Sequence, residues 1–473
     1  MTRKKFAIYL LLAAAVVSMS ACGNDEPEYD EYVSSSTAIT GFSLLKNDKV
    51  LKNLDSVFFT VDLDNFRIYN ADSLPYGTDV SRIQVSITSN GCKAMTITQS
   101  KDGEDDVVVD YLKNSTDSID FTKTVKLTMT SINGLYSHDY SVKVNVHQVV
   151  PDSMEWALVN RRQLPTRFGS AAEQRTVEMG GTTYCLTRAG SEYCMAASTD
   201  LLAFKWTYST PDFGMTPQVN SLTATDNALY ILSNDGGLYS SADGLAWTSC
   251  PAQMTTLIAG YGSTLLGLKK EGSVYYHVTY PATVATAAAA DFPVSGMSQA
   301  VTISNSWSEQ SQALIIGGRC ADSSLTGAVW GFDGKSWACL SNNRIPAAEG
   351  VTIFPYFSFK TYTNTWKTTK YSALIAFGGR LSSGKLSKTV YISLDNGINW
   401  KTGDSKIQLP DYVPAMWNSQ AIVNASVISR HSSVVTEWEC PYVYLFGGQN
   451  ESSQLINFVW RGVINRLEFK PVI

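Results

Sequence analysis

The feature that most constrains the fold is a short pattern that occurs three times in the last third of the chain. Each copy contains two adjacent glycines, a leucine eight residues after the first glycine and an aromatic residue thirteen residues after it. An apolar run precedes each glycine pair, which predicts that the pair ends a β-strand. Identical spacings in three places indicate a repeat architecture, in which small units stack side by side. The copies are Gly317-Gly318 with Trp330, Gly378-Gly379 with Tyr391, and Gly447-Gly448 with Trp460.

The glycines and the aromatic residues have a physical role in such a repeat. Paired glycines let the backbone turn where a Cβ atom would clash, and the aromatic residue then packs between neighbouring units. The pattern resembles the Kelch repeat of β-propellers. With three further blade markers, the resemblance implies a six-bladed β-propeller over residues 151–473, with about 54 residues in each blade. These further markers lie near Cys194, Tyr239 and Tyr275.

A second motif follows the aromatic residue of one repeat. The stretch Ser393-Leu-Asp-Asn-Gly-Ile-Asn-Trp400 resembles the Asp-box, and residues 241–247 form a version that is one residue shorter. In such a turn we expect Asp395 to accept backbone N–H bonds, Gly397 to take a positive φ and Trp400 to anchor the outer strand. In the families that carry it, the Asp-box is structural and lies away from the active site.

The sequence also predicts how the ring of blades closes. Trp156 is followed by a proline after nine residues and a glycine four residues later, and Trp337 is followed by the same two residues at the same spacings. We therefore expect the strand around Trp156 to complete the final blade, which removes an exposed sheet edge. The alternative is that residues 465–469 form that strand and Trp156 lines the rim.

The first residues carry an export signal. Residues 1–21 contain a basic start, a short apolar run and small residues before Cys22, which is typical of a signal peptide and too short for a membrane span. The ending resembles a bacterial lipobox, which implies that Cys22 carries a lipid and anchors the chain to a membrane. The alternative is an ordinary cleavage site with a chance cysteine.

Residues 22–37 are expected to form an acidic tether after the lipidated cysteine. Five of the seven residues from Asp25 to Glu31 are acidic, and such a stretch is solvated and extended. The segment also resembles the export signal of Bacteroidetes surface lipoproteins. This resemblance implies an outer-membrane lipoprotein exposed at the cell surface.

Residues 38–150 are predicted to form a separate β-domain. Residues 83–87, 125–129 and 140–146 alternate between apolar and polar positions, which places one face of each strand in a core. Short antiparallel strands over about this length are typical of an immunoglobulin-like β-sandwich. The Cys…Trp…Cys pattern of true immunoglobulin domains is missing, so the resemblance concerns architecture only, and the expected role is a spacer.

The composition excludes several kinds of function. The chain has 37 basic and 42 acidic residues without basic blocks after its start, which argues against a nucleic-acid partner. Four histidines leave little material for a metal site, and we predict no metal and no cofactor. Seven cysteines remain beside Cys22, an odd number at scattered spacings that forms no disulfide framework. Cys185 and Cys194 are expected to be buried free thiols, and the alternative is that they face each other across a hairpin that turns at Ala189-Gly190.

The candidate ligand-binding residues fall into two groups. The last two blades are expected to carry long loops rich in aromatic residues, which can stack on sugar rings or shield blade edges. Arginines at three positions near strand ends can converge on the central channel and hold a carboxylate, or can pair along blade edges. The candidates are Tyr362, Trp366 and Trp417 among the aromatic residues, and Arg167, Arg319 and Arg380 among the arginines.

The whole chain resembles a group of uncharacterised Bacteroidetes surface lipoproteins with an immunoglobulin-like domain and a Kelch-like propeller. This resemblance implies a location and a fold but no activity. We predict a non-catalytic binding module for glycans or for an envelope protein partner. The alternative is a glycan-active hydrolase or lyase with a sialidase-like propeller. No nucleophile elbow or phosphate-binding loop occurs, and the sequence assigns no catalytic residue.

Overall fold

A computed structural model describes residues 33–159, 163–282, 284–305, 308–341, 345–362, 364–365, 367–432 and 436–469. The regular secondary structure of the described chain is almost entirely β-strand, with two single-turn 3-10 helices, η1 (Leu54–Ser56) and η3 (Val219–Ser221). It forms two compact units, which divide between His147 and Gln148. Each unit is described below by itself.

The amino-terminal unit contains two sheets around one hydrophobic core. One sheet pairs β1 (Ile39–Leu44) with β4 (Val85–Ser89) in antiparallel fashion. The other has the order β2-β3-β8-β7-β5-β6, in which only the β3–β8 pair is parallel among the described strands. Its strands are β2 (Thr60–Asp62), β3 (Arg67–Tyr69), β5 (Ala94–Ser100), β6 (Val107–Asp110), β7 (Thr124–Thr130) and β8 (Ser137–Lys143).

Alternation along β7 explains how this core forms. Val125, Leu127 and Met129 are buried, whereas the residues between them face outward, as the sequence pattern predicts. Tyr140 of the neighbouring strand β8 is also buried, and its hydroxyl donates a hydrogen bond to the Thr37 carbonyl oxygen at 2.9 Å. One face of the large sheet therefore supplies the core of the unit.

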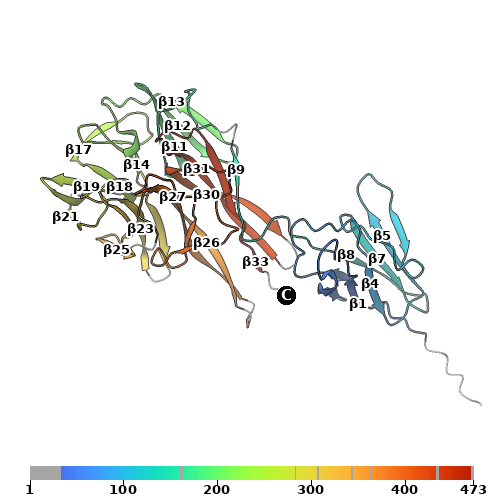
Figure 1. Ribbon diagram of the computed structural model, residues 1–473. Coiled ribbons are helices and arrows are strands. Elements are labelled where there is room, and N and C mark those ends of the chain that lie inside the picture. Colours follow the sequence, from blue (N-terminus) through green and yellow to red (C-terminus); the bar gives the residue numbers. More distant parts are fainter. Residues whose placement is uncertain are drawn as a thin grey trace, which may run out of the picture. The chain divides into compact units, whose positions relative to one another are not determined.

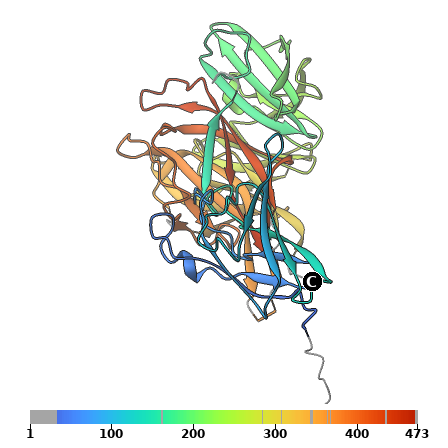
Figure 2. The same ribbon diagram turned by 90° about the vertical axis from the view of Figure 1, so that its right-hand side faces the viewer.

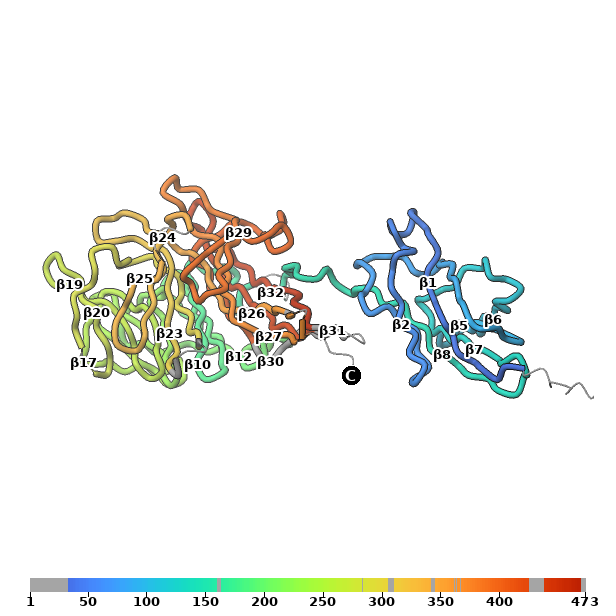
Figure 3. Tube along the Cα trace, turned by 90° about the horizontal axis from the view of Figure 1, so that it is seen from below, coloured from blue at the N-terminus to red at the C-terminus, as the bar shows by residue number. Residues whose placement is uncertain are grey.

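The second unit contains six antiparallel sheets among the described strands, five with four successive strands and a sixth in which β9 and β33 join three successive strands. The sequence colours pass from green through yellow and orange to red around this unit (Figure 1, Figure 2 and Figure 3). The first sheet contains β10 (Glu173–Met179), β11 (Thr182–Ala189), β12 (Glu192–Asp200) and β13 (Lys205–Ser209). The second contains β14 (Thr223–Ala224), β15 (Leu229–Leu232), β16 (Gly237–Ser241) and β17 (Thr248–Gln253). The third contains β18 (Thr256–Tyr261), β19 (Thr264–Glu271), β20 (Val274–Tyr280) and β21 (Ala285–Ala287).

The last three sheets include the longest strands of the molecule. The fourth sheet contains β22 (Val301–Asn305), β23 (Ser308–Arg319), β24 (Leu325–Phe332) and β25 (Trp337–Ser341). The fifth contains β26 (Ala348–Tyr362), β27 (Lys367–Leu381), β28 (Tyr391–Ser393) and β29 (Lys401–Thr402). The sixth contains β30 (Trp417–Ser432), β31 (Thr436–Gln449) and β32 (Val459–Ile464) together with β9 (Met154–Leu158). The short strand β33 (Glu468–Phe469) pairs with β31.

The six sheets form a closed ring. Each sheet touches the next in chain order, mainly through first strands, and β30 of the sixth sheet contacts β10 of the first. The paired glycines lie at these junctions: a Cβ atom on Gly317 would come within 2.5 Å of the Ala348 carbonyl oxygen, and Gly447 packs on Gln174 of the first sheet. Positive φ angles occur at all six paired glycines: Gly317, Gly318, Gly378, Gly379, Gly447 and Gly448. We call this end of each sheet the glycine end.

The ring closes through the strand around Trp156. Strand β9 pairs with β32, with Trp156 opposite Gly462, and a Cβ atom on that glycine would lie 2.6 Å from the indole ring. The segment 465–469 does not take this place, because β33 pairs with β31 instead. The prediction that the Trp156 strand completes the final sheet is confirmed, and its alternative is wrong. A strand from the start of the unit thus covers the last sheet edge.

The expectation of long loops in the last two repeats is wrong. The aromatic stretch that begins at Phe354 belongs to β26, and most of the segment from Trp417 to Trp438 belongs to β30 and β31. Phe354, Tyr356 and Phe357 are all buried, because neighbouring strands cover both faces of this part of β26. A strand with two covered faces loses the apolar–polar alternation by which strands are recognised.

The β26–β27 and β30–β31 hairpins extend far beyond the short fourth strands, as Figure 1 shows for β26 and β30. The first two strands of each sheet are joined at the opposite end from the paired glycines. We call this opposite end the hairpin end. The turn that links β28 to β29 also lies there. In that turn Ser393 Oγ donates to Asp395 (2.9 Å), the Asn399 N–H donates to Asp395 (2.8 Å), and the Trp400 indole N–H donates to the Gly397 carbonyl oxygen (2.9 Å).

Candidate ligand-binding groove and axial channel

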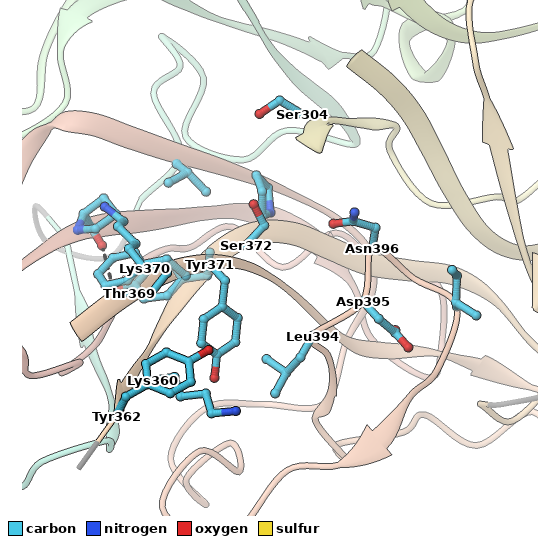
Figure 4. A pocket seen from close by; sticks show the side chains of 16 residues that line it. Ser304, Lys360, Tyr362, Thr369, Lys370, Tyr371, Ser372, Leu394, Asp395 and Asn396 are labelled. Carbon is cyan, nitrogen blue, oxygen red and sulfur yellow. Dashed lines mark hydrogen bonds between the residues drawn. The ribbon is translucent and has the colours of Figure 1, made fainter. Parts of the chain in front are cut away.

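An open groove of about 1170 Å³ lies beside the projecting β26–β27 hairpin. Strands β26 and β27 supply one side, and the turn from Leu394 to Ile398 faces them across the opening. Figure 4 shows Tyr362 and Lys370 on the hairpin strands, with Asp395 and Asn396 on the turn. The groove exists because the hairpin continues past the level at which β28 ends at Ser393.

Aromatic rings and ammonium groups dominate the hairpin side of the groove. Tyr362 is 44% exposed, and the Lys360 Nζ atom lies 4.9 Å from the centroid of its ring. The Lys370 Nζ atom lies 4.2 Å from the centroid of the Phe357 ring. Tyr371 adds a further partly exposed ring. Such a surface can stack on sugar rings and attract negative charge.

One carboxylate, Asp395, lies among the groove residues that the structure describes. Burial alone would raise the pKa of Asp395, but hydrogen bonds from Asn399 and Ser393 outweigh it and hold this pKa below its usual range. The ionised Asp395 carboxylate therefore forms hydrogen bonds within its own turn. The lysines of the groove keep their charge available for a ligand.

The hairpin is fixed at its base by Tyr356. This buried phenol lies between β31 and β32: its hydroxyl is 3.1 Å from the Pro441 carbonyl oxygen and 3.0 Å from that of Ile464. It also accepts a hydrogen bond from the Ile464 N–H at 3.2 Å. The fifth and sixth sheets therefore hold one wall of the groove in place.

A second cavity, the axial channel, has a volume of about 520 Å³ and is lined by the first strands of all six sheets. Pro355 and Val423 line both the channel and the groove, so the two cavities adjoin at the hairpin end. Polar side chains on the channel wall include Arg175, Glu178 and Asp226. The ring closure therefore brings charged residues of the first two sheets into one cavity.

Arg175 is the most unusual group in this channel. Its Nε atom is buried and has no hydrogen-bond partner among the described residues. Burial lowers the pKa of Arg175 to about 10, and no described carboxylate opposes this shift. Burial also raises the pKa of Glu178. Across the ring, Gln299 donates from Nε2 to the Thr176 carbonyl oxygen at 3.5 Å, and its Oε1 atom is buried without a described partner.

The structure separates the six residues that the sequence suggested for ligand binding. Tyr362 lines the groove, whereas Trp366 lies outside the described residues, as does the lipidation candidate Cys22. Arg380 and Trp417 come together at the glycine end, with the guanidinium 5.5 Å from the ring centroid. They belong to neighbouring sheets.

The other two arginines are also engaged at the glycine end. Arg319 forms a bidentate ion pair with Glu349 of the next sheet, with a closest distance of 2.8 Å. Arg167 donates to the Tyr208 carbonyl oxygen and to Thr210. In the described channel lining, none of Arg167, Arg319 and Arg380 takes part.

Sequence reasoning missed Arg175, Lys360, Lys370 and Tyr371. A signal was present for Arg175, since it lies in the run Glu173–Val177, which belongs to the first hairpin of the repeat region and is polar for an inner strand. Lys360, Lys370 and Tyr371 carried no comparable signal, because the strand pairing that brings them beside Tyr362 was not predicted.

In the part of the chain that the structure describes, no three His, Cys, Asp or Glu side chains gather closely enough to hold a metal ion. Within the same part, no helix has the length and apolarity needed to cross a membrane. Cys185 and Cys194 are buried free thiols, as predicted.

The closed ring of antiparallel sheets around an axial channel defines a β-propeller. A family model described as the DUF6242 beta propeller domain matches residues 150–472. A second model, the domain of unknown function (DUF6242) N-terminal domain, matches residues 34–144. The chain therefore belongs to the DUF6242 family, with both of its domains.

Comparisons with other proteins add only distant likenesses. No curated protein matches the chain. Similar solved structures include a fungal lectin from Aleuria aurantia (13% identity, TM-score 0.36, 63% of this chain and 93% of that chain) and YCF48 bound to D1 peptide (13%, 0.30, 64% and 83%). A thermostable family-43 glycoside hydrolase is a third (11%, 0.27, 66% and 94%).

Proposed function

We propose that this protein is a surface-displayed outer-membrane lipoprotein that binds glycans in the groove beside the β26–β27 hairpin, without catalysis. In this proposal a lipid on Cys22 anchors the chain, and an immunoglobulin-like domain serves as a spacer. A six-bladed, Kelch-like propeller with Asp-box turns carries the groove. The six sheets of the second unit supply one blade each.

The observation that carries the proposal is the chemistry of the groove wall. An exposed tyrosine, Tyr362, and a partly exposed one, Tyr371, stand beside Lys360 and Lys370 in an open cavity large enough for several sugar units. Aromatic faces stack on sugar rings, and ammonium groups favour acidic glycans. Glycoside hydrolysis usually needs two carboxylates, and Asp395 is the one that lines the described groove.

Affinity electrophoresis of the full chain in gels that contain acidic or neutral polysaccharides tests this function. We expect an acidic polysaccharide to retard the wild type and Tyr362→Ala to lose most of the retardation. The matched control is Tyr76→Ala, because Tyr76 is an exposed tyrosine of the amino-terminal unit. If no polysaccharide retards the wild type, glycan binding is wrong and an envelope protein partner becomes the better explanation.

The hydrolase or lyase alternative has one observation in its favour. Glu178 and Asp226 both line the axial channel, and burial raises the pKa of Glu178, as a general acid requires. Turnover of fluorogenic glycosides that disappears in Glu178→Gln would establish this alternative. Turnover that Glu178→Gln leaves unchanged would point to a contaminating enzyme.

A further inference from the structure

The axial channel holds a positive charge that the protein itself does not neutralise. Arg175 projects from the middle of β10 into the channel, and its buried Nε atom has no described partner. Buried charges in proteins are normally paired, because removal from water costs several kcal/mol per ion. A guanidinium that stays unpaired in a cavity therefore indicates a site at which an anion from outside completes the pair.

Gln299 lies close to the same point from the opposite side of the ring. Its Nε2 atom donates to the carbonyl oxygen of Thr176, the residue after Arg175. Its Oε1 atom is buried and accepts no described hydrogen bond. The channel thus presents a donor fork and a free acceptor together, and a ligand satisfies both only if it carries an anionic group and a hydrogen-bond donor.

Two carboxylates further restrict the kinds of ligand that the channel can bind. Glu178 follows Arg175 by three residues on the same strand, which corresponds to about 10 Å. Asp226 lies after β14 on the neighbouring sheet and lines the same cavity. These groups repel a ligand with several negative charges but accept hydrogen bonds from hydroxyl groups. They favour a single carboxylate on a molecule rich in hydroxyls.

We propose that the axial channel binds a hydroxy-carboxylate of monosaccharide size, such as a uronic acid, with its carboxylate on Arg175 and a neighbouring hydroxyl on Gln299. The planar guanidinium matches a carboxylate with two parallel hydrogen bonds. The volume of about 520 Å³ lies within the usual range for small-molecule sites. The channel adjoins the groove but uses different polar side chains, and the proposal does not rest on glycan binding in the groove.

Calorimetry and thermal unfolding of the full chain with sodium glucuronate test the proposal. Glucuronate is expected to bind and to raise the unfolding temperature, whereas glucose is not, because glucose lacks the carboxylate. Arg175→Met is expected to weaken glucuronate binding at least about tenfold, the loss usual for a hydrogen bond to a charged group. The matched control is Arg82→Met, an exposed arginine of the amino-terminal unit, which leaves the binding unchanged.

A second readout separates ligand binding from a structural role. Arg175→Met removes an unpaired buried charge, so the ligand-free variant should unfold at a higher temperature than the wild type. A structural role for Arg175 predicts the opposite shift. If Arg175→Met does not fold, Gln299→Leu replaces it, and glucuronate should bind that variant more weakly.

Three results would overturn the proposal. They are a wild type on which neither glucuronate nor galacturonate has an effect, an Arg175→Met variant that folds and binds glucuronate as tightly as the wild type, and glucose binding that equals glucuronate binding.

Discussion

The two ends of the propeller sheets use the same residue types for different purposes. At the glycine end, Arg319 is paired with Glu349 of the next sheet, and Arg380 lies over Trp417. At the hairpin end, the ammonium group of Lys360 lies over the exposed ring of Tyr362, beside an open groove. Repeated positions hold the ring together, whereas positions at which the repeats differ are free to meet a ligand.

The comparison also explains where the strongest sequence pattern lies. The paired glycines recur because three successive junctions need backbone to approach backbone or side chain without a Cβ atom. The groove depends on the long β26–β27 hairpin, and among the described strands only the fifth and sixth sheets have hairpins of this length. Substitutions at the glycine end and in the ring should therefore change stability, and those at the hairpin end should change binding.

The largest effect is expected where the ring closes. Trp156→Ala removes a buried indole that fills the space above Gly462, and it should lower the free energy of unfolding by about 4 kcal/mol. Chemical denaturation followed by tryptophan fluorescence and circular dichroism measures this. A loss below about 1 kcal/mol would show that β9 contributes little to the framework.

The second-largest loss of stability is expected at the junction around Gly317. Gly317→Ala places a Cβ atom 2.5 Å from the Ala348 carbonyl oxygen at a positive φ, and it should cost about 3 kcal/mol. Gly384→Ala is the matched control, because Gly384 has a positive φ but no atom within 4 Å of the added Cβ. The control should cost about 1 kcal/mol. Equal losses in the two variants would remove the packing argument for the glycine end.

A pH scan probes the interior between the two ends. Desolvation lowers the pKa of His277 to about 4, and the ring packs against Phe292 at 4.4 Å between centroids. The unfolded chain binds this proton near pH 6.5, so the stability of the folded protein falls as the pH drops from about 6.5 to 4. In the His277→Gln variant, the decrease in the free energy of unfolding over this pH range should be smaller by about 2 kcal/mol. Parallel stability curves for the two proteins would contradict it.

A smaller change is expected at the ion pair of the glycine end. Arg319→Gln removes a partly exposed contact to Glu349, and it should lower the free energy of unfolding by about 1 kcal/mol. Polysaccharide retardation should stay at the wild-type value. Lost retardation in a folded Arg319→Gln variant would return the ligand site to the glycine end.

The smallest stability change is expected at the hairpin end. Tyr362→Ala removes an exposed ring, so its free energy of unfolding should lie within about 0.5 kcal/mol of the wild type. The same variant should lose glycan retardation. A variant that keeps its retardation but unfolds more easily would show that this ring belongs to the framework.

Much of the framework followed from the sequence, but little of the candidate ligand site did. The apolar runs before the glycine pairs predicted strand ends near Gly317 and Gly447, and a repeated spacing after Trp156 predicted the closing strand. The aromatic stretch before Tyr362 was expected to be a loop. The strand could not be recognised from the sequence, because burial on both faces removes the apolar–polar alternation.

The sequence by itself determined the local geometry, because a turn needs only a few neighbouring residues. Asp395, Gly397 and Trp400 bond within one turn, and glycine is the residue that takes a positive φ at little cost. Only the tertiary structure decided that Arg175 and Gln299 share a cavity. They lie more than a hundred residues apart, and only the ring of six sheets brings their side chains to one cavity.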